Sequence, residues 1–178
     1  MSGLRFCVAT WMFLAVLVAG CSSTTLTDSW KDPEYRGTIR KVYVVGVTNV
    51  DIDRYQFEDV VSQELQAYGV KAVASYSDLD FPIDLDEQAI TARASAIGAD
   101  SLLMARVLGK YSRHNEADYR HTATDYQVTV LEVILYDVGS GNQLWSAKLE
   151  TIVDRRMEFL LSDFAKAVVQ DLRKQHLL

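Results

Sequence analysis

The chain has 178 residues and a formal net charge of −6, with 24 acidic side chains against 18 basic ones. This length suits one domain with an additional segment, and the acidic excess argues against binding to the phosphates of nucleic acids. The chain has two cysteines, Cys7 and Cys21, which are too few for a disulfide framework. Composition therefore predicts one hydrophobic core that folds without disulfides.

The first 20 residues have the three-part form of a secretory signal peptide. Arg5 is the only charged residue before the apolar stretch at residues 6–18, and the small residues Ala19 and Gly20 follow this stretch. The stretch is shorter than the about 20 apolar residues that a membrane-spanning helix needs. We therefore expect residues 1–20 to be removed as a targeting segment.

The segment ends in LVAGC at residues 17–21, which resembles the lipobox of bacterial lipoproteins. The resemblance implies that the sulfur of Cys21 receives a diacylglycerol and that the chain is cut before Cys21. Acyl chains such as palmitate would then anchor the protein in a membrane. The residue after the cysteine is Ser22 and not aspartate, which by resemblance to enterobacterial lipoproteins implies export to the outer membrane, with the protein facing the periplasm. The alternative is an ordinary signal peptide with a chance cysteine.

The mature chain predicts alternating strands and helices after a polar start. Residues 21–40 indicate a lipidated tether that ends in a docking segment, and the apolar run KVYVVGV at 41–47 predicts a strand covered on both faces. Amphipathic stripes, each ended by a glycine, predict the next two helices. These two helices are expected at 53–68 and 84–97, and a third helix at 157–172. The further expected strands are at 70–74, 100–108, 126–136 and 143–152.

The order β-α-β-α-β-β-β-α predicts one compact α/β domain, with α+β character, over residues 41–178. Right-handed crossovers make the first three strands parallel, and the glycine-containing turn at 139–142 makes the last two strands an antiparallel hairpin. The sheet is therefore expected to be mixed. The longest predicted irregular stretch, 111–124, is rich in charge, histidine and tyrosine.

Several short motifs together resemble small bacterial lipoproteins known as a domain of unknown function. They are the lipobox, TDSWKDP at 27–33, Tyr76, LYDV at 135–138 and LWSA at 144–147. The order of elements also resembles the amino-terminal domain of TolB and CsgG-like periplasmic lipoproteins. These resemblances imply a domain that docks on envelope proteins or builds assemblies. The chain lacks the membrane-inserting hairpin that a CsgG-like pore needs, so we do not expect pore formation.

The candidate metal ligands fit no metal motif. The acidic stretch at 78–87 has Ile83 and Ala89 at the positions where an EF-hand loop needs glycine and glutamate. His114 and His121 are seven residues apart, which matches no zinc spacing. We expect a solvated loop and a solvated hairpin tip instead, with no metal and no cofactor. The sequence shows no nucleophile elbow or phosphate loop, which predicts a protein that is not an enzyme.

Aromatic side chains are candidates for a binding surface, because aromatics are enriched at interface hot spots. The candidate partner contacts are Trp30, Pro33, Tyr111 and Tyr119. Trp30 fits docking on its own domain and docking on a partner equally well, whereas Trp145 is expected in the core. Glu132 interrupts an apolar stripe, and because a buried carboxylate needs a partner, this predicts a partly open face of the sheet.

The leading hypothesis from sequence is a non-catalytic, lipid-anchored periplasmic protein that acts as an adaptor or assembly factor of the cell envelope. Its partners would be the membrane, through Cys21, and another envelope protein. The alternative is a binding module for a small apolar ligand or lipid, which requires a pocket of the order of 300 Å3 between sheet and helix. A weaker alternative, a cell-wall hydrolase, requires polar groups with shifted pKa values in one cleft.

Overall fold

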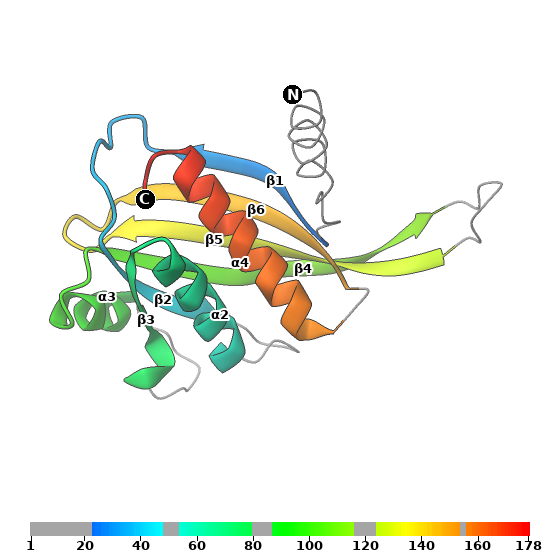
Figure 1. Cartoon of the computed structure of the whole chain (residues 1–178), viewed down its shortest axis with the longest axis horizontal. Helices are drawn as coiled ribbons and strands as arrows, with labels where there is room; N and C mark the ends of the chain where they lie inside the picture. The colour runs from blue at the N-terminus through cyan, green and yellow to red at the C-terminus, as the bar shows by residue number, and fades with distance from the viewer. Residues whose placement is uncertain (1–22, 48–53, 80–86, 116–123, 154–155) are drawn as a thin grey trace, which may run out of the picture.

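The computed structural model describes residues 23–47, 54–79, 87–115, 124–153 and 156–178. These residues form a six-stranded mixed sheet and three α-helices (Figure 1). The strands are β1 (Thr24–Lys31), β2 (Lys41–Val47), β3 (Lys71–Ala74), β4 (Ser101–Asn115), β5 (Thr124–Asp137) and β6 (Gln143–Val153). The helices are α2 (Arg54–Ala67), α3 (Glu87–Ala96) and α4 (Met157–Lys174), with a 3-10 turn η1 at Ser75–Ser77.

The sheet order is β1-β6-β5-β4-β2-β3. Strand β2 is parallel to both β3 and β4, while β4, β5 and β6 form an antiparallel meander. The predicted parallel strands and antiparallel hairpin are therefore confirmed. The sequence also placed the helix ends correctly, because Gly69 and Gly98 follow α2 and α3 with φ values of 83° and 69°, a conformation that favours glycine.

Strand β1 is an element that the sequence analysis did not predict. The expected docking segment lies antiparallel along β6, with Thr24 opposite Thr151 and Lys31 opposite Trp145. Its sequence, TTLTDSWK, lacks the regular apolar alternation that marks a strand. Pairing of its backbone with β6, rather than side-chain pattern, therefore makes it the edge strand of the sheet.

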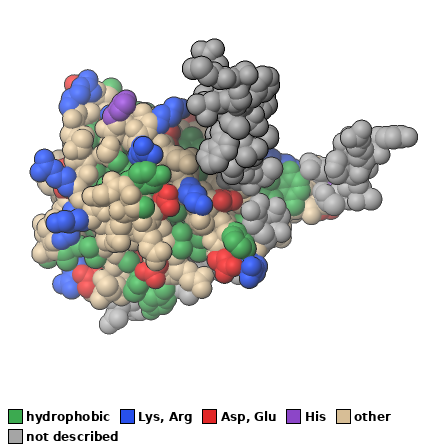
Figure 2. Space-filling model, viewed as in Figure 1, with side chains coloured by type: hydrophobic (Ala, Val, Ile, Leu, Met, Phe, Trp, Pro, Cys, Tyr) green, Lys and Arg blue, Asp and Glu red, His purple; other side chains and the backbone are tan. Residues whose placement is uncertain are grey.

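The helices divide between the two faces of the sheet. Helices α2 and α4 cover one face (Figure 1), and their core includes Phe57, Phe164 and Trp145. Trp145 is fully buried, and its Nε1 donates to Asp171 Oδ2 at 2.9 Å, which confirms its predicted place in the core. Helix α3 packs on the opposite face over Tyr43. On the helical side seen in Figure 2, acidic and basic side chains are interspersed.

The β4–β5 hairpin is longer than predicted and forms an arm (Figure 1). Strand β4 continues to Asn115 and β5 begins at Thr124, so the expected irregular stretch is strand at both of its ends. Gln127 of β5 lies opposite Val153, the last residue of β6. From there to the last described residues of the arm, β4 and β5 pair only with each other. None of the described helices is long and apolar enough to cross a membrane.

Candidate functional site

In one half of the sheet, one of the two faces is not covered by any described helix. Helices α2 and α4 cover the other face, and α3 covers only the end that contains β2. We call the uncovered surface of β1, β6, β5 and the adjoining part of β4 the open face. Its side chains are those of Asp28, Trp30, Met104, Arg106, Glu132, Ile134, Ser146 and Lys148.

A row of four charged side chains of alternating sign crosses the open face. In the strand register, Asp28 lies opposite Lys148, Lys148 opposite Glu132, and Glu132 opposite Arg106. Each of these residues comes from one of four adjacent strands. The Arg106 and Glu132 side chains form an ion pair at 2.6 Å. Glu132 therefore has a charged partner on a solvent-accessible face, as the interrupted apolar stripe predicted. We call these four residues the charged row.

A second row, apolar except for Ser146, runs beside the charged row at a distance of two residues on each strand, and we call it the apolar row. Trp30 pairs with Ser146, Ser146 with Ile134, and Ile134 with Met104. The backbone of Trp30 belongs to its own sheet, while 46% of the residue remains exposed. Trp30 is thus part of its own sheet, whereas docking of its exposed side chain on a partner stays a prediction.

A cleft of about 510 Å3 lies where α3 meets the open face. Its lining residues are Glu87, Gln88, Thr91, Ala92, Ser95, Leu102, Met104, Tyr136, Asp137, Val138 and Gly141. Burial and the nearby Glu87 carboxylate raise the pKa of the Tyr136 phenol. On the opposite face, the core under α4 leaves a small groove of about 110 Å3. A further cleft of about 430 Å3 lies between α2 and the start of α4. The α3 cleft, which is larger than this one, is large enough for a ligand of ordinary size.

A buried polar network, which the sequence analysis missed, lies at the carboxyl ends of β2 and β3. Glu58 is fully buried. Its Oε1 accepts from the Gly46 amide at 2.9 Å, from Arg54 Nε at 2.8 Å and from Ser75 Oγ at 2.7 Å, and its Oε2 accepts from the Tyr76 amide at 2.9 Å. Such ends often hold active sites in α/β folds. Here both carboxylate oxygens are bound within the protein, so the network joins α2 to the strands.

The Asp78 carboxylate, at the start of the predicted acidic loop, is bound by protein groups, and residues 80–86 of this loop lie outside the described residues. Tyr43 Oη donates to Asp78 Oδ1 at 2.6 Å, and Arg93 pairs with Oδ2 at 2.7 Å. Burial and the Asp78 hydrogen bond raise the pKa of Tyr43. Within the described part of the chain, no group of three or more His, Cys, Asp and Glu side chains is placed to bind a metal.

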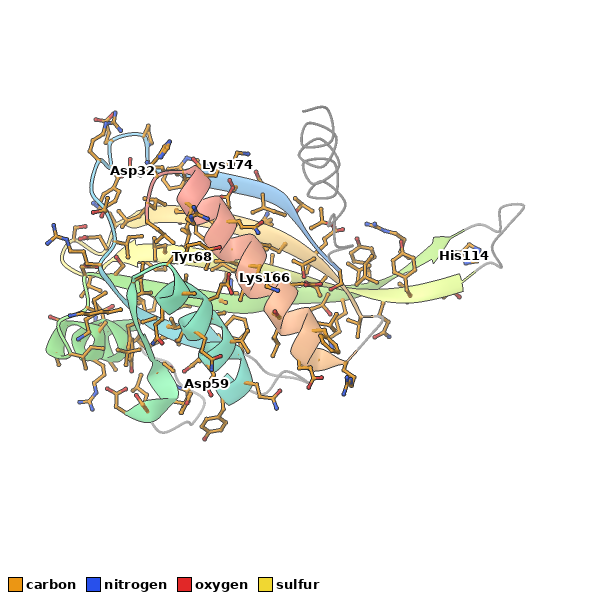
Figure 3. The ribbon with its side chains drawn as sticks, in the orientation of Figure 1. Asp32, Asp59, Tyr68, His114, Lys166 and Lys174 are labelled. Atoms are coloured by element: carbon orange, nitrogen blue, oxygen red, sulfur yellow. The ribbon has the colours of Figure 1, made fainter. Side chains whose placement is uncertain are left out.

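The arm carries polar and aromatic side chains that pair with one another. Arg113 Nη2 donates to Tyr111 Oη at 2.6 Å and to Glu150 Oε2 at 2.9 Å. Desolvation, followed by the Glu150 hydrogen bond, raises the pKa of the Tyr111 phenol. His114 lies near the far end of the arm (Figure 3), where its Nδ1 is 2.6 Å from Asp125 Oδ1 across the hairpin. The expectation of a solvated hairpin holds for this histidine.

Of the predicted site residues that the structure describes, Tyr111 lies apart from Trp30 and Pro33. Tyr111 is 37% exposed on the arm, whereas Trp30 lies on the open face. Pro33 is exposed in the turn after β1, where Arg36 binds its carbonyl oxygen. The other predicted site residues, Cys21, Ser22 and Tyr119, lie outside the described residues, as does His121. Lipidation and sorting therefore stay predictions.

Comparison with known proteins places this chain by its fold only. No family model matches the sequence, and no curated protein matches it. Among solved structures, a PelC L103M dodecamer from Paraburkholderia phytofirmans is 15% identical with a TM-score of 0.55, over 84% of this chain and 97% of that chain. A second PelC dodecamer from the same organism is 16% identical with a TM-score of 0.51, over 84% and 94%.

Bacterial lipoproteins occur among the other structures that were matched. Lipoprotein GNA1162 from Neisseria meningitidis is 15% identical with a TM-score of 0.48, over 76% of this chain and 99% of that chain. At these identities the similarity to the PelC structures shows a shared fold and no shared activity. The resemblance of the sequence motifs to a lipoprotein family therefore stays a resemblance.

Proposed function

We propose that this chain is a lipid-anchored, non-catalytic assembly factor of the bacterial cell envelope, and that its open face binds a second copy of the chain. Cys21 anchors it, and Ser22 directs it to the outer membrane with the domain in the periplasm. The observation that carries the docking proposal is the charged row. It lies on a face without a helix and alternates in sign across four strands.

The charged row is complementary to itself. We consider two open faces related by a twofold axis that lies between the sheets and crosses the row at right angles. In this arrangement Asp28 faces Arg106 of the second copy, and Lys148 faces Glu132 of the second copy. A twofold interface uses the same patch on both subunits, so such complementarity is what it requires. The apolar row beside it, including Trp30, would supply buried area.

The comparison with PelC supports self-assembly as a use of this fold. Both PelC structures are described as dodecamers. Their low identity transfers no interface to this chain, and the pairing proposed above rests on the charges of this chain alone. Alternating charges disfavour wrong registers, because a shift by one strand would place like charges opposite each other.

Exchange of the two outer charges of the row tests this pairing. Arg106→Glu alone, or Asp28→Arg alone, places like charges opposite each other twice in the dimer, and we expect each variant to weaken self-association at least about tenfold. The double variant restores opposite charges across the interface and should associate like the parent. Native mass spectrometry of the mature chain, released from detergent, measures the association.

The double variant is informative because its two positions are far apart within one chain. Asp28 and Arg106 lie three strands apart, about 14 Å, so rescue is expected between chains rather than within one. Lys166→Glu is the matched control for Arg106→Glu, because it changes the net charge by the same amount at an exposed position of α4 (Figure 3). A monomeric parent whose open face crosslinks in cells to a different envelope protein would contradict docking of a second copy and favour the adaptor role.

The α3 cleft favours a second candidate function, the binding of a small ligand. Its lining combines the apolar side chains of Leu102 and Met104 with the carboxylates of Glu87 and Asp137, and none of its described residues is a lysine or arginine. This lining suits an apolar ligand with a neutral or cationic head.

We expect the mature chain to bind dodecylamine saturably under this second proposal. Ala92→Trp should weaken binding about tenfold by filling the cleft, whereas Ala89→Trp, at an exposed position of α3 outside the lining, should leave binding unchanged. Isothermal titration calorimetry measures both affinities. Equal affinities for these two variants would argue against the cleft as the binding site.

A further inference from the structure

The predicted lipid-bearing residue lies very close to a fixed point of the domain. The Ser23 amide and hydroxyl both donate to Asp163 Oδ2, at 3.0 and 2.9 Å. The Ser23 carbonyl oxygen accepts from the Ile152 amide at 2.9 Å. One residue, Ser22, separates this clamp from Cys21, and two fully extended residues span at most about 7 Å. A lipid on Cys21 would therefore hold the clamp at the membrane surface.

Exposed apolar side chains lie beside this clamp. Phe159 is four residues before Asp163 in α4, so the two side chains share one face of the helix, one turn apart. Phe159 is 46% exposed, and the Arg156 guanidinium lies 5.1 Å from the centre of its ring. Val153, at the end of β6 directly after Ile152, is 39% exposed.

The apolar surface continues from the clamp toward the base of the arm. Val153 and Met157 line the groove of about 110 Å3, together with Val107 at the base of the arm and Lys110 beyond it. Hydrophobic side chains are visible in this region, where the arm leaves the domain (Figure 2). This end of the molecule also contains the starts of β1 and α4 (Figure 1).

We propose that Phe159, Val153 and Arg156 form a membrane-contact patch that rests on the phospholipid surface holding the anchor. The proposal rests on the proposed lipidation of Cys21. An aromatic ring and an aliphatic side chain enter the boundary between headgroups and acyl chains, while a guanidinium pairs with phosphate at the surface. The short connection to Cys21 favours the membrane as occupant over a protein, because it leaves little room between the clamp and the lipid.

Depth-dependent fluorescence quenching tests the patch. Phe159→Trp and Tyr68→Trp each replace an exposed aromatic by another, so both variants should fold. Tyr68 follows α2 at the end of the molecule away from the arm (Figure 3). The mature lipidated chain is placed in vesicles of phosphatidylethanolamine and phosphatidylglycerol that contain brominated acyl chains. We expect the emission of the tryptophan at 159 to fall by about half and to shift to shorter wavelength. The emission of the tryptophan at 68 should neither fall nor shift.

Two readouts separate failure of the patch from failure of the anchor. The parent emission, from Trp30 and Trp145, is subtracted, and the mass of the mature chain reports its acylation. Chains that are acylated and float with the vesicles, but show equal quenching at 159 and 68, would overturn the membrane-contact patch alone. Chains without acyl groups would overturn the anchor and the patch together.

Discussion

Replacement of Glu58 by alanine should lower the free energy of unfolding by about 3–5 kcal/mol, because it removes a buried carboxylate that neutralises a buried guanidinium. Arg54 is only 8% exposed, and its guanidinium is paired with Glu58 Oε1. The same carboxylate accepts from the amides of Gly46 and Tyr76. These donors are buried or partly buried, so loss of their acceptor leaves them unsatisfied in a place that water does not easily reach. Urea unfolding followed by circular dichroism measures the loss.

Two further variants distinguish loss of the network from a general effect of shortening a helix side chain. Glu58→Gln keeps the shape but removes the charge, and should fall between the parent and Glu58→Ala. Glu64→Ala, at a partly exposed position of the same helix, should change stability by less than about 1 kcal/mol. Similar losses in Glu58→Ala and Glu64→Ala would show that the network adds little to stability.

The parts of the fold that were predicted correctly have local signals. The apolar run of β2 indicated a strand buried on both faces, and Gly69 and Gly98 marked the ends of two helices. Strand β1 had no such signal, since its side chains are mostly polar and its conformation comes from pairing with β6. The extension of β4 to Asn115 likewise depends on its partner strand, because polar residues in a hairpin look the same as a loop in sequence.

The candidate site was less predictable because it depends on register between distant strands. Glu132 was recognised as a break in an apolar stripe, but its partners Arg106 and Lys148 come from other strands. The network around Glu58 was missed for a similar reason. The spacing of Arg54 and Glu58 is that of an ordinary surface ion pair on a helix. Packing of α2 against Gly46 and η1 buries this pair, and a Cβ added at Gly46 would lie 2.9 Å from Phe57 Cδ1.

Replacement of Cys21 by alanine should abolish acylation completely, because the sulfur is the only atom of this residue that could accept the diacylglycerol. One acyl chain gives only marginal membrane binding, and each buried methylene adds about 0.8 kcal/mol, so several chains would anchor the mature protein firmly. Their loss should remove that anchor altogether, a larger effect than any substitution within the folded domain. Incorporation of labelled palmitate and the mass of the purified chain measure the change.

Cys7→Ala is the matched control, since Cys7 and Cys21 are the two cysteines of the chain and Cys7 lies within the predicted signal peptide. We expect this variant to incorporate palmitate like the parent. The contrast between the two variants separates the lipobox from the alternative of an ordinary signal peptide with a chance cysteine. If Cys21→Ala were still acylated, the anchor would lie elsewhere. The clamp at Ser23, one residue beyond Ser22, would then no longer fix which end of the domain faces the membrane.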